Sequence, residues 1–419
     1  MRIWLKMGII FLCIPMAFAD ELKSVDSVTL KNVIVKVLEN NPALKANDYE
    51  SRIAAEKIKQ ASLTKPVKAN LEVENFAGSN RFNRFDSVET TLSLVKILES
   101  GNKPALRGDV AQQEANLLQN EMDAKRLDLL SKAARRFIHV AVDQERLGIA
   151  GDKLALIKRT ADIVDYRVKL GRSPVAEQRR VAIAFARAEI ELEHAEHELL
   201  TSRLKLSSMW GETAARDLSV KAALYELANI ESFDQLETLI QQNPDLIKFA
   251  SKQRLAEARL NLSRSRRRPD VALSGGIRYF SGTDDGALLL SASIPLESRK
   301  RALPDIQASM LMAEREPLLY EQQRLALYTS LFEFYQELLH ARTAVDALQE
   351  KIIPEAELAL RDYEKGFKAG RYSLLELTEA QQTLLNTRLE VVVAAEKFHR
   401  NRIEIERLTG TEIKTGARQ

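Results

Sequence analysis

Apolar and polar positions alternate in steps of three and four residues along most of this chain. The clearest example is segment 181–206, where every third or fourth side chain is apolar or small. A seam of this kind predicts a long helix packed against its neighbours as in a coiled coil. The seam consists of Val181, Phe185, Ala188, Leu192, Ala195, Leu199, Ser202 and Leu206.

The same spacing predicts three helices in the first half of the chain. One covers residues 30–61, a long one begins at Pro104 and continues to Leu170, and a returning helix ends at Gly211. The long helix would measure about 100 Å. The turn Gly171-Arg172-Ser173-Pro174 separates it from the returning helix, and Ser173 is expected to cap that helix.

Four shorter segments follow a period of two instead. Polar loops rich in Gly, Asn and Asp connect them in pairs, which predicts two hairpins. Such segments are typical of a membrane barrel, although an ordinary sheet packed on helices gives the same pattern. The segments are 69–76, 87–97, 271–280 and 287–295.

The two halves of the chain repeat one plan. Asn41-Pro42 recurs as Asn243-Pro244, and residues 171–211 pair without a gap with residues 370–410. The second half therefore predicts a helix at 233–266, a long helix at 304–368 and a returning helix that ends at Gly410. Pro317 and Pro354 are expected to kink or interrupt the long helix.

The first residues predict a secretory signal peptide, with a retained membrane anchor as the alternative. A basic start precedes an apolar run and the small-residue site Ala17-Phe18-Ala19. The only cysteine, Cys13, lies in this run, and its neighbours do not resemble a lipoprotein processing site. The expected division is signal peptide 1–19, first repeat 20–215, equatorial linker 216–232, second repeat 233–410 and C-terminal tail 411–419.

The predicted strands imply an oligomer if they enter a membrane. Beyond the signal no apolar run is long enough for a spanning helix, so a membrane role would need strands. Two hairpins supply too few strands, because the smallest membrane barrels have about eight. An unpaired strand edge is not tolerated in lipid, so several copies would have to share one barrel.

Composition and motifs narrow the function classes. The chain has 62 Lys and Arg against 59 Asp and Glu, and this near-balance argues against a nucleic-acid binder. It contains no nucleophile–base, phosphate-loop or dinucleotide motif, so we expect neither an enzyme nor a bound cofactor. His194 and His197 could contribute to a zinc site, but a closed site needs further ligands, and a solvated helix face is preferred.

These features together resemble the TolC-like family of outer-membrane efflux channels over about residues 25–412. The paired Asn-Pro motifs carry the resemblance, together with the second turn, Gly370-Arg371-Tyr372-Ser373-Leu374-Leu375-Glu376. The first turn, from Arg167 to Pro174, is similar to the cobalt–zinc–cadmium branch of the family. The resemblance implies a mainly α chain with a small β part. Three copies would form a 12-stranded β-barrel continued by an α-helical barrel.

The resemblance also implies partners and a location. Such a homotrimer sits in outer-membrane lipid with a long periplasmic extension. It docks onto a periplasmic adaptor (membrane fusion protein) that links it to an inner-membrane pump of the resistance-nodulation-division (RND) class. Heavy-metal cations are the expected cargo, with drug efflux or type I protein secretion as alternatives. A periplasmic coiled-coil scaffold is the alternative of another class.

The candidate site residues lie at the two helical turns. Glu376 and Glu379 share a helix face and are expected to form acidic rings in a trimer that favour cations. Arg179 or Arg180 is expected to bond to them and close the periplasmic gate, although a solvated charged face is the alternative. Glu177, Phe367 and Tyr372 complete the expected gate, and the expected adaptor-docking residues are Gly171, Arg172, Ser173, Pro174, Gly370, Arg371 and Ser373.

A basic cluster lies where a helix meets the third strand. Arg264, Arg266, Arg267 and Arg268 precede Pro269. They could contact anionic lipid headgroups at the periplasmic interface. Alternatively, they only end a helix favourably, because cations stabilise a helix C-terminus.

Overall fold

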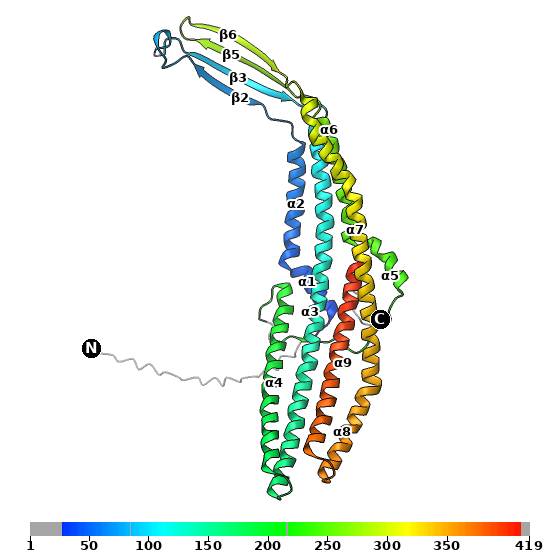
Figure 1. Cartoon of the computed structure of the whole chain (residues 1–419). Coiled ribbons are helices and arrows are strands. Elements are labelled where there is room, and N and C mark those ends of the chain that lie inside the picture. The colour runs from blue at the N-terminus through cyan, green and yellow to red at the C-terminus, as the bar shows by residue number, and fades with distance from the viewer. Residues whose placement is uncertain (1–26, 84, 215–216, 412–419) are drawn as a thin grey trace, which may run out of the picture.

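The computed structural model describes residues 27–83, 85–214 and 217–411. It is a long, narrow molecule with a sheet at one end and a bundle of helices beneath it (Figure 1). The expected signal peptide and nearly all of the expected C-terminal tail lie outside the described residues. The predicted mainly helical chain with a small sheet is confirmed.

The sheet has four antiparallel strands in the order β2-β3-β5-β6. The strands are β2 Lys68–Glu74, β3 Glu89–Leu98, β5 Val271–Phe280 and β6 Asp285–Ser293, and the short helix η1 Asn80–Phe82 lies in the first hairpin loop. One face is apolar because Leu71, Leu92, Ile277 and Leu288 stand in register across it. The opposite face is polar.

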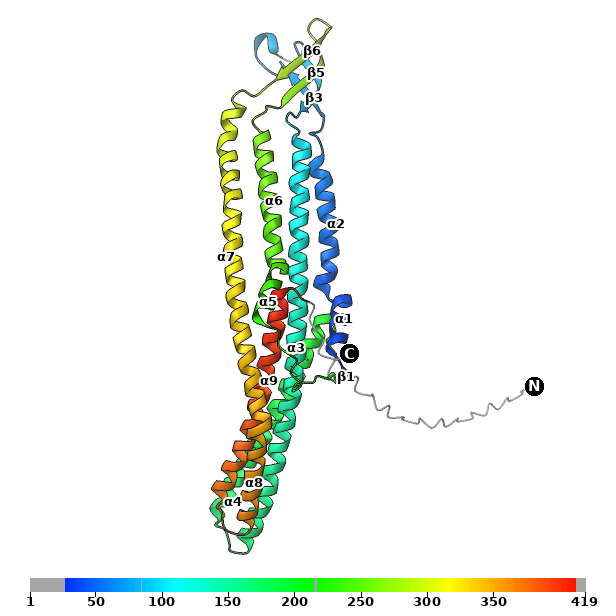
Figure 2. The same cartoon turned by 90° about the vertical axis from the view of Figure 1, so that its right-hand side faces the viewer.

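Four helices extend from the sheet, and they lie side by side in the same order as the strands (Figure 2). Helix α2 packs on α3, α3 on α6, and α6 on α7, so the edge helices α2 and α7 continue the edge strands. Their bounds are α2 Pro42–Ser62, α3 Lys103–Lys169, α6 Pro244–Ser265 and α7 Ser298–Ala347. The upper half is therefore one curved layer, and its two edges, β2 with α2 and β6 with α7, lack a neighbour among the described residues.

Below the middle of the molecule two hairpins replace this layer. Helix α3 continues down and returns as α4 Val175–Ser207 followed by η2 Ser208–Trp210. Helix α7 passes through a π-helical turn, η4 Leu348–Ile352, into α8 Ile353–Lys368 and returns as α9 Leu374–Thr409. Helices α3 and α9 pack against each other in the centre of this lower half.

A collar of short elements surrounds the middle of the bundle. It contains α1 Leu30–Asn40, α5 Phe233–Leu239, η3 Ile240–Gln242, and the short parallel strands β1 Ser27–Val28 and β4 Ser219–Val220. The collar covers the largest core cluster, in which Val33, Val37, Phe137 and Leu206 are buried. Strands β1 and β4 were not predicted, because two residues are too few to show a period.

The helix predicted at 30–61 is wrong in one respect, since it is two helices broken at Asn41-Pro42. The Asn41 side chain accepts hydrogen bonds from the amides of Ala43 and Leu44 and so begins a new helix. The second half breaks at the equivalent point, where Asn243 accepts from the Asp245 amide. Proline after asparagine favours such a start, because the first turn needs no proline N–H.

The predictions for Pro317 and Ser173 need correction, whereas the prediction for Pro354 is confirmed. Helix α7 continues through Pro317 without interruption, whereas Pro354 stands in the first turn of α8 directly after the π-helical turn. Ser173 is not a cap: Pro174 precedes α4 without a side-chain cap, and the Ser173 hydroxyl accepts from Arg167 instead. Among the described residues, no helix is both long and apolar enough to cross a bilayer.

Candidate functional site

The two turns at the lower end of the molecule, called the tip here, share one backbone design. The tip comprises Gly171–Pro174 and Gly370–Ser373. Gly171 and Gly370 have φ of +67° and +76°, a left-handed conformation that glycine adopts without a Cβ penalty. The next amides, of Arg172 and Arg371, donate back to carbonyls of the preceding helix at 2.8 Å each. These bonds satisfy carbonyls that a helix end would otherwise leave unpaired.

Arg167 joins one turn of the tip to the other. Its Nε donates to the Ser173 hydroxyl at 3.1 Å, and its Nη1 donates across to the Phe367 carbonyl. The guanidinium also lies over the Phe367 ring, 4.7 Å from its centroid. Sequence reasoning missed Arg167 as a site residue. The signal was the repeat itself, which places this arginine opposite a glycine, Gly366, in the second half.

An aromatic pair covers the outside of the second turn. Tyr372 folds back onto Gly366, where an added Cβ would lie 2.1 Å from the tyrosine ring. The Tyr372 ring packs against Tyr363 at a centroid distance of 4.8 Å. Phe367 is fully buried beneath them, with 1% of its surface exposed. Of the two aromatic gate candidates, Phe367 is therefore part of the hydrophobic core, and Tyr372 lies at the surface.

Glu376 is held by the turn that precedes it. Its carboxylate accepts from the Ser373 amide at 2.7 Å and from the Ser373 hydroxyl at 2.8 Å, while the Glu376 amide donates to that hydroxyl. This is a capping box, which fixes the first turn of α9. The bond from the Ser373 amide lowers the pKa of Glu376, so the carboxylate stays charged at neutral pH.

The other predicted gate residues lie near the tip without contacting one another in the single chain. Glu379, Arg179 and Arg180 are exposed and Glu177 is partly exposed. No ion pair joins either arginine to Glu376 or Glu379 within the described part of the chain. The proposed charge lock would therefore have to form between copies, and it stays a prediction. Of the predicted docking residues, Arg172, Pro174 and Arg371 are exposed, and Ser173 is partly exposed.

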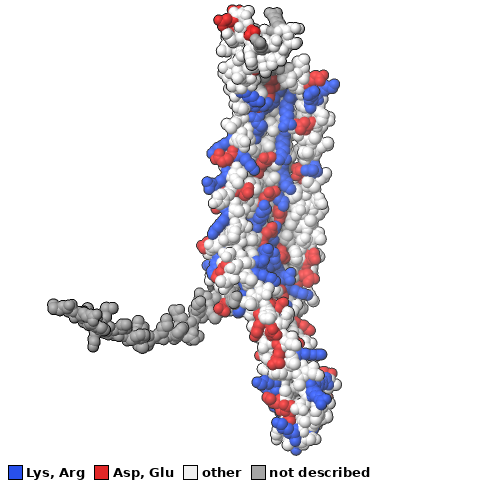
Figure 3. All heavy atoms as spheres, turned by 90° about the vertical axis from the view of Figure 1, so that its left-hand side faces the viewer, with Lys and Arg blue, Asp and Glu red and all other residues white. Residues whose placement is uncertain are grey.

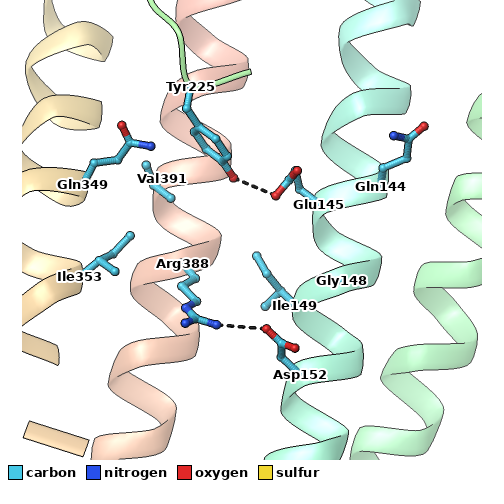
Figure 4. Close-up of a pocket in the computed structure, with 10 residues that line it drawn as sticks. All are labelled: Gln144, Glu145, Gly148, Ile149, Asp152, Tyr225, Gln349, Ile353, Arg388 and Val391. Atoms are coloured by element: carbon cyan, nitrogen blue, oxygen red, sulfur yellow. Dashed lines mark hydrogen bonds and ion pairs between the residues drawn. The ribbon is translucent and has the colours of Figure 1, made fainter. Parts of the chain in front are cut away.

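A lateral groove lies above the tip, at the level of the π-helical turn (Figure 4). A cavity of about 420 Å³ opens between α3, η4, α8 and α9, and Tyr225 of the collar lies beside it. The Tyr225 hydroxyl donates to Glu145 at 3.1 Å, and Arg388 bonds to Asp152 at 3.1 Å. Burial raises the pKa of Tyr225, so the phenol stays protonated. The groove was not predicted, because its residues meet only in three dimensions.

The predicted histidine pair does not build a metal site in this chain. His194 is exposed on α4, with its ring 3.9 Å from Glu198. Within the described residues, no three side chains of the His, Cys, Asp and Glu types come together as metal ligands would. The helix face that carries His194 is open to solvent.

Comparison with known proteins identifies a matching family. Residues 236–411, which contain the second turn of the tip, match the outer membrane efflux protein family. The cobalt-zinc-cadmium resistance protein CzcC of Cupriavidus metallidurans is 23% identical over 325 residues, covering 77% of this chain and 78% of that protein. The second half of the chain therefore matches outer membrane efflux proteins in sequence.

Further similar proteins cover most of the chain. Outer membrane protein TolC of Vibrio cholerae is 20% identical over 72% of this chain and 72% of its own length. The crystal structure of the Campylobacter jejuni CmeC outer membrane channel superposes with a TM-score of 0.75, at 14% identity, over 99% of this chain and 96% of that one. In agreement with the family match and the curated relatives, the chain is a passive conduit and not an enzyme, and its location is the outer membrane.

Proposed function

We propose that three copies of this chain form one duct. The duct would dock onto a periplasmic adaptor, receive heavy-metal cations from an RND-class inner-membrane pump, and release them outside. The observation that carries the proposal is the open layer. In the described part of the chain, strands β2 and β6 each lack a neighbour on one side, and helices α2 and α7 form the corresponding edges below them. Because lipid does not tolerate a free strand edge, the partner of each edge is the opposite edge of another copy.

The edge helix α7 carries an apolar seam that is mostly exposed, and only Phe332 at its lower end contacts an aromatic ring of the described residues, that of Phe233 in α5 at a centroid distance of 5.4 Å. Four large apolar residues recur at intervals of seven along it, and all are substantially exposed. A heptad stripe of this kind is what one helix presents to another in a coiled coil. The stripe consists of Leu311 at 62%, Leu318 at 71%, Leu325 at 56% and Phe332 at 48% exposure. A second copy of this chain is the occupant that fits it.

Residues that lie at the same height on the two edges of the bundle allow a cross-linking test of this assembly. Ser309 on α7 contacts Ser263 on α6, and Gly108 on α3 meets Ser62 on α2, so these positions share a level near the sheet. Leu318 on α7 and Ile53 on α2 each lie nine residues further down, at one level on opposite edges. The only native cysteine is Cys13, so cysteines introduced at both positions report cleanly.

We expect the double variant Leu318→Cys with Ile53→Cys to give covalently linked dimers and trimers in isolated membranes treated with a short thiol cross-linker. The variant Leu318→Cys alone should remain monomeric on a denaturing gel. Linked species from the single variant would mean that identical edges meet, which rules out the ring. A protein that washes off membranes with carbonate would favour the periplasmic scaffold instead.

The cargo is proposed from the relatives, since CzcC is named for cobalt, zinc and cadmium resistance. Expression of the chain with its adaptor and pump should raise the zinc, cobalt or cadmium concentration that cells survive. Protection against drugs only, or export of a protein only, would select those alternatives. The acidic rings have their own readout: neutralising Glu376 and Glu379 to Gln should reduce cation preference in planar-bilayer recordings, and unchanged recordings would reject the rings.

A further inference from the structure

Six cations gather where the sheet meets the helices, and they are called the basic belt here. All six side chains belong to exposed residues. Arg264, Arg267 and Arg268 lie at the end of α6, and Arg299, Lys300 and Arg301 lie in the first turn of α7. Helices α6 and α7 are neighbours, so the two groups form one surface. Lysine and arginine side chains also begin directly below the sheet on the face in Figure 3.

The belt differs from its surroundings in making no ion pair with the described residues. Other cations at this junction are paired: Lys65 and Lys103 both bond to Asp270, Arg107 bonds to Glu99, and Arg266 bonds to Asp305. In the described part of the chain, none of the six belt residues makes an ion pair. The junction thus uses some cations to hold its own elements together and leaves six others to solvent.

The placement of three of these cations opposes the helix that carries them. The N-terminus of a helix carries partial positive charge, which favours acidic residues in the first turn. The first turn of α7 has none and carries Arg299, Lys300 and Arg301 instead. The residue before the helix, Glu297, makes no side-chain cap bond. Helix stability therefore does not account for these cations, and an external anion would.

The belt begins where the exposed apolar surface ends. Ile294 and Leu296, which are 51% and 84% exposed, precede Arg299 by only a few residues. On the neighbouring strand, Leu273 is 42% exposed and follows Arg268 within five residues. In an outer membrane efflux protein, this border is the height at which hydrocarbon gives way to lipid headgroups. Arg299, Lys300 and Arg301 are consecutive and project about 100° apart around α7, so this group reaches the lipid side.

We propose that the basic belt binds the anionic phospholipid headgroups of the leaflet that meets the sheet–helix junction. The proposal rests on the membrane position of the sheet. Each Lys or Arg near an anionic bilayer surface contributes a favourable increment, and six per copy make the site selective for charged over zwitterionic lipid. Phosphatidylglycerol and cardiolipin are the bacterial lipids with this chemistry. Bound lipid would fix the height of the duct in the membrane, so the tip would be held at a constant depth.

The test uses the full-length assembly purified in neutral detergent and mixed with equal amounts of phosphatidylglycerol and phosphatidylcholine. Native mass spectrometry counts the lipids retained. The wild type should retain phosphatidylglycerol preferentially, and the preference should fall with added salt. The triple variant Arg299→Gln, Lys300→Gln and Arg301→Gln should lower the preference by about tenfold or more, given the contribution expected for each surface charge.

A matched control removes the same charge elsewhere. Lys158, Arg187 and Lys397 are exposed on the lower helices, and their triple glutamine variant should retain lipid as the wild type does. Equal retention of both lipids by the wild type overturns the proposal, as does an equal loss in the control. The variant Arg299→Lys with Arg301→Lys keeps the charge and should keep the preference, which separates lipid binding from misfolding. If the wild type is absent from the outer-membrane fraction, the proposed function fails rather than the belt.

Discussion

Single asparagines explain why the motif Asn-Pro occurs twice in this chain. Besides beginning a helix, each side chain also ties that helix to the end of a returning one. The Asn41 amide donates to the Met209 carbonyl at 2.6 Å, and the Asn243 amide donates to the Leu408 carbonyl at 2.8 Å. Both asparagines are buried, at 6% and 0% exposure. One side chain therefore satisfies a helix start and a helix end together.

Replacing Asn243 by Ala should destabilise the fold by about 2–4 kcal/mol, because a cap is lost and a buried carbonyl is left without its donor. Thermal unfolding of the detergent-solubilised protein measures this cost. Asn261→Ala, an exposed change on the same helix, serves as the control and should shift the midpoint little. A midpoint for the Asn243 variant equal to that control would show that the tie carries no stability.

Arg167 should control how firmly the two turns of the tip are held. Arg167→Ala removes its two hydrogen bonds and the contact with the Phe367 ring. Because charge-assisted bonds are worth about 1.5–3 kcal/mol when buried, the looser tip should raise single-channel conductance. Arg172→Ala, the neighbouring exposed arginine, is the matched comparison in planar-bilayer recordings. Equal conductance in wild type and Arg167→Ala would argue against a role in closure.

At the scale of elements, α3 and α9 are joined by a ladder of polar pairs along their length. From the collar downward the rungs are Arg135 with Glu404, His139 with Glu396, Asp152 with Arg388 and Thr160 with Gln381. The partners run in opposite directions, as antiparallel helices require. Such a ladder fixes the register of the two hairpins, since a shift by one turn would mispair every rung.

The His139 rung gives the ladder a pH dependence. The bond to Glu396 raises the pKa of His139, and the same bond lowers the pKa of Glu396, in a site that also holds Asp143, Arg146 and Arg400. Protonated His139 stabilises the fold fully at pH values below 6.5, its ordinary pKa. This stabilisation is lost as the pH rises through the raised pKa. The Glu396 carboxylate stabilises the fold fully at pH values above 4.5, its ordinary pKa. This stabilisation is lost as the pH falls through the lowered pKa.

We therefore expect the stability cost of His139→Gln to be greatest between about pH 4.5 and 6.5 and to fall as pH rises through the raised pKa of His139. The difference should not exceed about 1 kcal/mol, because the histidine is partly exposed to solvent. Thermal midpoints of both proteins across this range measure it. His340→Gln, an exposed histidine without an ion pair, should track the wild type at every pH. A pH-independent difference would mean that packing, not charge, is lost.

The sequence was sufficient to predict elements whose hydrophobic pattern extends over many residues. It was insufficient to predict contacts between elements. The long helices and the strand 271–280 were predicted because a seam or an alternation is visible over many residues. The breaks at Asn41 and Asn243 were read as repeat markers and not as helix starts, since the helical period continues through them. Arg167, the ladder and the lateral groove need the packing of residues that are up to 269 positions apart, and no local pattern reports that.

At the scale of the whole molecule, the polar face of the sheet would line the exit of the duct. Arg278 lies on this face, donates to Thr91 at 2.8 Å, and pairs with Glu89 at 2.8 Å and Glu74 at 3.1 Å. One guanidinium thus joins three strands and offsets two carboxylates. In a closed ring this arrangement would recur in every copy at one height, where it would set the charge that a leaving ion meets.

Arg278→Gln should make the exit more cation-selective, because two carboxylates per copy lose their counter-charge. Reversal potentials in a salt gradient measure the change, which should be largest at low ionic strength. Arg278→Lys keeps the charge and should stay close to the wild type. A shift toward anions, or none at all in an intact channel, would show that the polar face does not line the path.

The two hairpins of the lower half differ in the continuity of their descending helices. Helix α3 runs for 67 residues without a break from the sheet to the tip. Its counterpart changes at residues 348–352 to a wider π-helical winding, and a proline follows at once. One strut is therefore stiff along its full length, and the other has a built-in joint beside the collar. Any bending of the conduit would concentrate below that joint, leaving the membrane end at rest while the far end changes its aperture.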